Sequence, residues 1–117
     1  MRILRATLPL TLALIFAAGL AAAGDPKTPL GKWMKPNMGA PMAGQDFAAL
    51  QKGFDAVASK PPAKAASSDY AQWAAMSKKG SAAAAAQDVA GVKAACKSCH
   101  DQYKQAYITD YPNAAFP

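Results

Sequence analysis

The sequence predicts an all-α protein, an antiparallel four-helix bundle. The chain is rich in alanine, lysine, glutamine and aspartate and poor in valine, isoleucine and threonine, a composition that favours helix over strand. Apolar residues recur at three- and four-residue spacing within four segments, as they do on the buried face of a helix. Short links rich in proline, glycine and serine separate these segments. Four helices with one apolar face each bury those faces most simply as an antiparallel bundle.

Residues 1–23 are predicted to be a signal peptide rather than part of this bundle. Two arginines begin the segment, an apolar run over residues 8–20 follows, and three alanines supply the small residues that a signal peptidase needs. The run is too short for a membrane anchor, and no basic stop-transfer flank follows it. We therefore expect cleavage after position 23 and export to the periplasm. Residues 24–117 then form a single small domain without a membrane span.

The first helix is predicted to begin at Thr28, a favourable N-cap, with Pro29 in the first helical position. Its apolar face carries four residues at four-residue spacing: Leu30, Met34, Met38 and Met42. Pro36 and Pro41 each lack a backbone donor. We expect them to kink or break the helix.

The second helix is predicted from Gln45 or Asp46 to about Ser59. Its apolar residues repeat at helical spacing: Phe47, Leu50, Phe54 and Val57. Two prolines end this helix and begin a linker over residues 60–67.

The third helix is predicted to start at Ser68 as N-cap and to reach Gly80, with a continuation through the alanine run at 82–86. The fourth is predicted from an Asp88 cap to about Tyr107. Its core-facing residues are Val89, Val92, Cys96, Cys99 and Tyr103. The tail that follows is expected to be irregular.

One motif carries the chemistry, Cys-Lys-Ser-Cys-His at residues 96–100. Two thiols at this spacing can each add to one vinyl group of haem, and the histidine directly after them then lies under the iron. The two cysteines and the single histidine of the chain all fall within this motif. A thioredoxin-like redox pair needs a strand–turn–helix context and a zinc site needs four ligands. The motif therefore predicts one covalently attached haem c on Cys96 and Cys99, with His100 as an iron ligand.

The distal side of the iron must be formed by residues elsewhere in the chain. The 17 residues after His100 contain no methionine, and the chain has no second histidine, so any distal group must come from residues before Cys96. Lys32 and Lys35 would first have to lose a proton, which is costly near neutral pH.

Residues 96–104, CKSCHDQYK, resemble the C-terminal signature of the class II cytochromes c, which comprise cytochrome c-prime and its low-spin relatives. The resemblance is specific over residues 86–107 and architectural before them. The chain is shorter than usual for that family and carries two prolines in its first helix. The resemblance implies an up-down-up-down bundle around the haem, and members often pair through their first two helices, so a homodimer is an option.

The resemblance also implies that the first helix faces the distal side of the iron. A methionine there gives a six-coordinate electron carrier, whereas an apolar non-ligand leaves a five-coordinate iron that binds small gases. Met34 is our first choice of ligand because it lies on the turn before Pro36, and Met38 is the second. A thioether is a suitable soft ligand that raises the reduction potential. Methionines at this spacing also commonly serve as core filler.

Four other residues near the predicted site have weaker assignments. Trp33 and Trp73 are large enough to wall a haem pocket, although ordinary core packing explains them equally well. Tyr103 is expected to pack in the core. Lys104 is expected to be solvated, with a position near the outer imidazole nitrogen as the alternative.

The expected function is one-electron transfer by a monohaem cytochrome, not catalysis, because the sequence offers no catalytic base or nucleophile. The alternative is a five-coordinate binder or sensor of NO or CO, and a haem-free thiol oxidoreductase is the third reading. The formal charge of +6 falls to +4 without the two arginines of the leader. The remaining cations are dispersed lysines, which argues against nucleic acid. Their excess suits acidic redox partner proteins.

Overall fold

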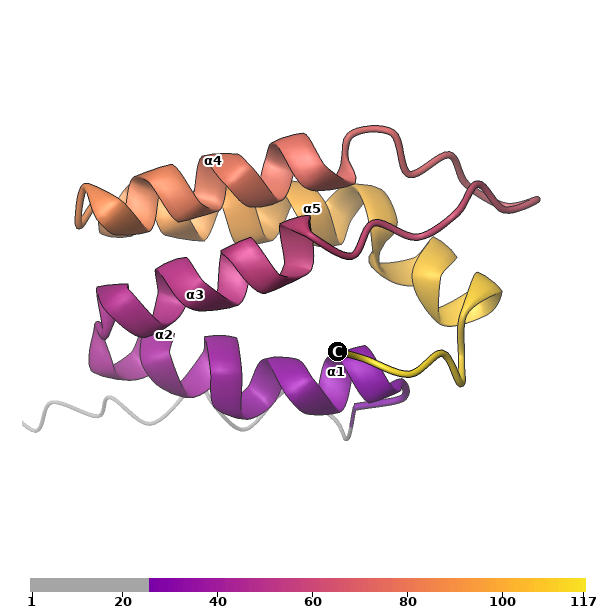
Figure 1. The fold of residues 1–117 in the computed structure, drawn as a ribbon, viewed down its shortest axis with the longest axis horizontal. Coiled ribbons are helices and arrows are strands. Elements are labelled where there is room, and N and C mark those ends of the chain that lie inside the picture. Colours follow the sequence, from indigo (N-terminus) through magenta and orange to yellow (C-terminus); the bar gives the residue numbers. More distant parts are fainter. Residues whose placement is uncertain (1–25) are drawn as a thin grey trace, which may run out of the picture.

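The computed structural model of the chain describes residues 26–117, so the predicted signal peptide lies outside the described residues. Within that range the protein is all-helical and has no strand, which confirms the predicted all-α class. The elements are α1 (Pro29–Met34), the π-helical segment η1 (Lys35–Gly39), α2 (Ala40–Gly44), α3 (Phe47–Ala58), α4 (Trp73–Ala85) and α5 (Val89–Asp110). Because α1, η1 and α2 follow one another without a break, they form a single first helix, and residues 26–117 contain four helices. Successive helices run antiparallel (Figure 1).

The helices pack in chain order. The first helix contacts α3 through η1 and α2, α3 contacts α4, and α4 contacts α5. Between residues 26 and 117 no close backbone contact joins the first helix to α5. A closed four-helix bundle would bring its first and last helices together. This bundle instead leaves that side open at the backbone level, and the candidate site described below lies there.

The π-helical segment explains how the first helix accommodates two prolines. The predicted break is wrong, because the helix continues through Pro36 and Pro41, although its α-helical hydrogen-bond pattern is disturbed there. The Ala40 N–H donates to the carbonyl five residues earlier instead of four, and such a π-bulge takes up an extra residue within a helix. The Asn37 side-chain amide also donates to the Trp33 carbonyl at 2.8 Å. The helix therefore accommodates the prolines by a shift in its hydrogen-bond register, without a break.

The predicted N-caps Thr28 and Asp88 are confirmed, and Asp46, one of the two predicted starts of the second helix, is also an N-cap. The side-chain oxygens of Thr28, Asp46 and Asp88 each accept a hydrogen bond from the backbone N–H three residues ahead, at 3.0, 3.1 and 2.9 Å. Each bond satisfies one of the orphan donors at a helix start. These caps fix the starts of the first helix, α3 and α5.

The predicted Ser68 cap is wrong, since α4 begins at Trp73. The Asp69 carboxylate accepts from the Ala71 N–H at 3.1 Å, a local turn that competes with helix formation. The Gln72 N–H, just before the helix, donates to the Tyr103 hydroxyl of α5 at 3.0 Å. A tertiary contact therefore caps α4. The helix does continue through the alanine run, as predicted.

The last helix is longer than predicted and ends at Asp110 rather than near Tyr107. The Tyr70 hydroxyl donates to the Asp110 carboxylate at 2.7 Å, and the Ser67 hydroxyl donates to the same group. These bonds hold the end of α5 against the linker before α4. They join residues 40 or more positions apart, so helical periodicity alone could not reveal them.

Two groups of buried side chains form the core. The aromatic cluster consists of Leu30, Val57, Tyr70, Trp73, Tyr103 and Tyr107. The Leu50 cluster consists of Leu50, Phe54, Ala84 and Val92. Cys99 packs against the aromatic cluster and Cys96 against the Leu50 cluster. The two cysteines of the motif therefore lie beside different halves of the core.

Gly80→Ala is expected to destabilise the protein by about 1–3 kcal/mol through overpacking. A Cβ at this buried position of α4 would lie closer than 3.0 Å to three atoms of the Phe54 ring on α3. Thermal unfolding followed by circular dichroism measures the loss. Gly44→Ala is the matched control, because nothing lies within 4 Å of a Cβ there and alanine favours helix. Equal melting temperatures for Gly80→Ala and the wild type would contradict the close packing of α3 on α4.

Tyr70→Phe is expected to cost about 1 kcal/mol at pH 8, the usual net value of a hydrogen bond, and less as the pH rises. Burial and the bond to Asp110 raise the pKa of Tyr70 above its ordinary value of 10. The folded state then keeps this proton while the unfolded state loses it, so the stabilisation is complete below pH 10 and declines above it. Urea unfolding at several pH values measures the difference. A gap between the two proteins that stays constant past pH 10 would contradict this assignment.

Candidate functional site

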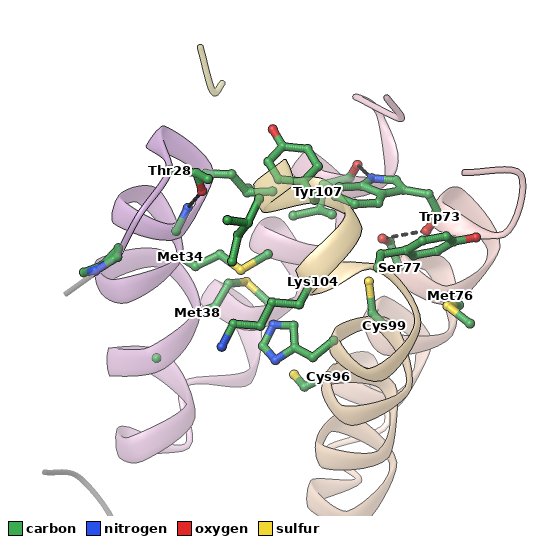
Figure 2. A pocket seen from close by; sticks show the side chains of 18 of the residues that line it. Thr28, Met34, Met38, Trp73, Met76, Ser77, Cys96, Cys99, Lys104 and Tyr107 are labelled. Carbon is green, nitrogen blue, oxygen red and sulfur yellow. Dashed lines mark hydrogen bonds between the residues drawn. The ribbon is translucent and has the colours of Figure 1, made fainter. Parts of the chain in front are cut away.

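A cavity of about 580 Å³ lies between the first helix and α5. Residues of α3 and α4 form its floor, among them Phe54, Val57 and Trp73. The volume falls in the range of about 300–1,000 Å³ that is typical of ligand and cofactor pockets, which are mostly apolar with a few polar groups. The cavity therefore occupies the side on which the bundle lacks a helix–helix contact (Figure 2).

All three chemically distinctive residues of the motif line this cavity: Cys96, Cys99 and His100. They belong to one turn of α5, where positions three and four apart lie on the same helix face. Both thiols are half-buried, whereas His100 lies at the rim and is exposed as a residue. Helix α5 therefore presents two sulfurs and an imidazole to a single space.

The two thiols are poor nucleophiles in this environment. Burial is the main cause that raises the pKa of Cys99 to about 11, and the neighbouring Cys96 raises it further. Burial also raises the pKa of Cys96. Reactive cysteines of disulfide oxidoreductases have lowered pKa values instead. Near neutral pH both groups are therefore protonated thiols, unlike the attacking thiolate of a redox pair.

His100 is held in its neutral form. Burial of the ring lowers the pKa of His100, and the charge of Lys104 one turn later lowers it further, while Asp101 acts in the opposite direction. Neutral imidazole is the form that binds a metal. Lys104 is exposed yet lines the cavity. Of the two predictions for Lys104, the alternative position near the imidazole therefore fits the structure better than the purely solvated position.

Three methionines line the cavity on the side of the first helix. Met34 is the last residue of α1, Met38 lies in η1, and Met42 lies in α2. Figure 2 shows Met34 and Met38 on the first helix facing Cys96, Cys99 and Lys104 across the cavity.

The same methionines also contact the core. Met34 packs against the aromatic cluster, whereas Met38 and Met42 pack against the Leu50 cluster. The sulfur of Met38 lies so close to Gly53 of α3 that a Cβ there would clash with it. The location of these methionines on the cavity wall agrees with a role as iron ligands, and their core contacts agree with a role as core filler.

The aromatic residues separate into two roles. Trp73 and Tyr103 line the cavity, whereas Trp33 packs against Phe116 with ring centroids 4.8 Å apart. Tyr103 is 1% exposed and accepts a hydrogen bond from Gln72. The predicted core role of Tyr103 is confirmed, and of the two tryptophans Trp73 is the one on the cavity wall.

Sequence reasoning missed several residues of the wall. Met76 and Ser77 of α4 line the cavity, as does Lys27 before α1. Lys35, which the sequence offered only as an unfavourable iron ligand, lines it as well. The lysines appeared dispersed along the chain, and their common location depends on the packing of the first helix against α3.

Residues 26–117 contain no group of three or more histidine, cysteine, aspartate or glutamate side chains arranged to hold a metal ion. Over the same range no helix is both long and apolar enough to cross a membrane. Comparisons of the chain with protein-family models, curated proteins and solved structures gave no significant match.

Proposed function

We propose that this protein is a monohaem c-type cytochrome that transfers single electrons. The observation that carries the proposal is the common location of the motif's two thiols and imidazole on one cavity, opposite a wall of three thioethers. Cys96 and Cys99 would hold the haem covalently, and His100 would ligate its iron.

The donor groups and the cavity suit such a cofactor. Thioether formation adds each S–H across a vinyl double bond, which forms one S–C and one C–H bond and needs no external oxidant. The half-buried thiols point to a space that is large and mainly apolar. His100 is neutral and ready to bind iron. When bound, haem supplies the reversible ferrous–ferric couple.

The remaining wall residues of the chain have supporting roles. Met34 is the preferred distal ligand and Met38 the second choice. The ammonium groups of Lys27 and Lys35 suit the carboxylates of haem propionates. Trp73 fills the floor and helps to exclude water, which increases the strength of electrostatic interactions inside the cavity.

The setting of the protein is part of the same proposal. The N-terminal leader would direct it to the periplasm, where haem attachment after export is consistent with the motif. The lysine excess would guide it towards acidic redox partner proteins. The resemblance to class II cytochromes c supports this assignment and allows a homodimer.

A five-coordinate binder of NO or CO is the second candidate. The contacts of Met34 with the aromatic cluster and of Met38 with Gly53 favour it, because a methionine that stays packed in the core does not reach the iron. His100 would then be the only protein ligand. The raised pKa values of both cysteines make the haem-free thiol oxidoreductase less suitable.

The test has two parts. Acid-acetone extraction of the purified mature protein shows whether the haem is covalently attached. Absorption spectra of a separate, untreated sample are recorded in both oxidation states, with and without CO. We expect the colour to remain with the polypeptide, low-spin spectra, and slow CO binding. High-spin spectra with immediate CO binding would select the gas-binding function. A colourless protein with the mass of the bare polypeptide would refute both.

A further inference from the structure

The C-terminal tail returns to the first helix after α5 ends. In Figure 1 the C-terminus lies beside α1. Phe116 meets Trp33 of α1 edge-on, with ring centroids 4.8 Å apart and an interplanar angle of 68°. Both side chains are partly buried against the aromatic cluster. The contact therefore joins the two ends of the described chain.

The tail is also fastened to the linker between α3 and α4. The Tyr111 hydroxyl donates to the Ala63 carbonyl at 2.5 Å. Lys60 places its ammonium 5.8 Å from the centroid of the Phe116 ring, within the range of a cation–π interaction. Phe116 thus reaches α1 from a segment that has its own attachments.

Helix α1 has few other attachments. Its backbone makes no close contact with α3, α4 or α5, and among the described helices it approaches only η1, its own continuation. The side chain of Leu30 is buried in the aromatic cluster, and Met34 packs at its edge. Apart from its continuation into η1, α1 is held by the packing of Leu30, Trp33 and Met34 on the aromatic cluster, so the contact of Trp33 with Phe116 is one of its few tertiary contacts.

We propose that the tail acts as a strap that positions α1, with Phe116 as its positioning residue. Trp33 precedes Met34 directly, so a restraint on the Trp33 ring also restrains the part of the cavity wall that faces the motif. The strap keeps α1 close to the cavity although no helix of the bundle packs against it at the backbone. Its effect on a distal ligand or gas rests on the proposed haem function, but its effect on α1 does not.

The experiment compares wild type and Phe116→Ala by hydrogen exchange with mass spectrometry, using purified protein in its haem-loaded form. We expect exchange over residues 29–34 to become about tenfold faster, the size expected from one lost aromatic pair. Exchange over α4 should stay unchanged. In the same samples CO should associate several-fold faster, a change that a contact serving global stability alone would not produce.

Two further variants control for ring loss. Phe47→Ala removes another half-buried phenylalanine, which packs on the Leu50 cluster and does not line the cavity, and should leave exchange over residues 29–34 unchanged. Phe116→Tyr keeps an aromatic ring at the contact and should restore both exchange and CO association to near the wild-type values.

The outcomes separate the two proposals. Exchange over residues 29–34 that stays within twofold of wild type in Phe116→Ala overturns the strap. Faster exchange with an unchanged CO rate overturns its positioning role. A wild-type protein without covalent haem refutes the proposed function, and the exchange comparison then still decides on the strap in the haem-free chain.

Discussion

Replacing both cysteines, Cys96→Ala with Cys99→Ala, is expected to abolish covalent haem attachment completely. The two thiols are the only ones in the chain, and both line the cavity, so no other residue can form a thioether. Secreted protein should then have the mass of the bare polypeptide and lose any colour to acid-acetone. Each single variant should retain at most one thioether bond.

Ser98→Ala is the matched control for this pair. It removes a small polar side chain from the same turn, between the two cysteines, and Ser98 is not part of the cavity wall. Full covalent haem is expected in this variant. His100→Ala should retain the thioethers but lose the iron–imidazole bond, with a changed spectrum. Colour that survives extraction from the double cysteine variant would disprove attachment through the motif.

Met34→Ala is expected to remove the methionine-to-iron charge-transfer band of the ferric protein and to lower its reduction potential. Loss of a thioether ligand should shift the potential by on the order of 100 mV, a modest part of the roughly 0.8 V range that axial ligands cover. CO binding should become faster because the distal position is open. Near-infrared absorption and redox titration measure these changes.

Met76→Ala is the matched control, because Met76 lines the same cavity from α4 rather than from the first helix. It should keep both the band and the potential close to those of the wild type. If the band persists in Met34→Ala and disappears in Met38→Ala, the distal ligand is Met38. A wild-type protein without the band would assign these methionines to the core and favour the gas-binding function.

Much of the fold could be predicted from local sequence. Thr28 and Asp88 cap helices as predicted because an N-cap acts on backbone donors three residues away. The start of α4 could not be predicted in this way. Ser68 is a good local cap, but Gln72 is satisfied by Tyr103, a residue 31 positions away.

The prolines illustrate a different kind of failure. The lack of an N–H at Pro36 and Pro41 correctly indicates a disturbed α-helical ladder. It does not indicate whether the helix breaks or shifts its hydrogen-bond register. The register shifts here, and η1 also packs against α3, so the outcome depends on contacts outside the segment.

In the candidate site, too, some features follow from local sequence and others depend on contacts between distant residues. Cys96, Cys99 and His100 are adjacent in sequence, so their common location on a helix face follows from periodicity. The lysines at the cavity and the contact of Phe116 with Trp33 join distant parts of the chain. No local pattern encodes them, and only the packing of the helices brings them together.

The packing of the helices in chain order has a consequence for maturation. Contacts between successive helices are short in sequence separation, and such topologies fold rapidly. The polypeptide can therefore assemble most of its core early, while the seam between its first and last helices stays accessible from outside. Under the proposed function, haem would then enter from this side instead of through a finished interior, and it would fill the cavity between the first helix and α5.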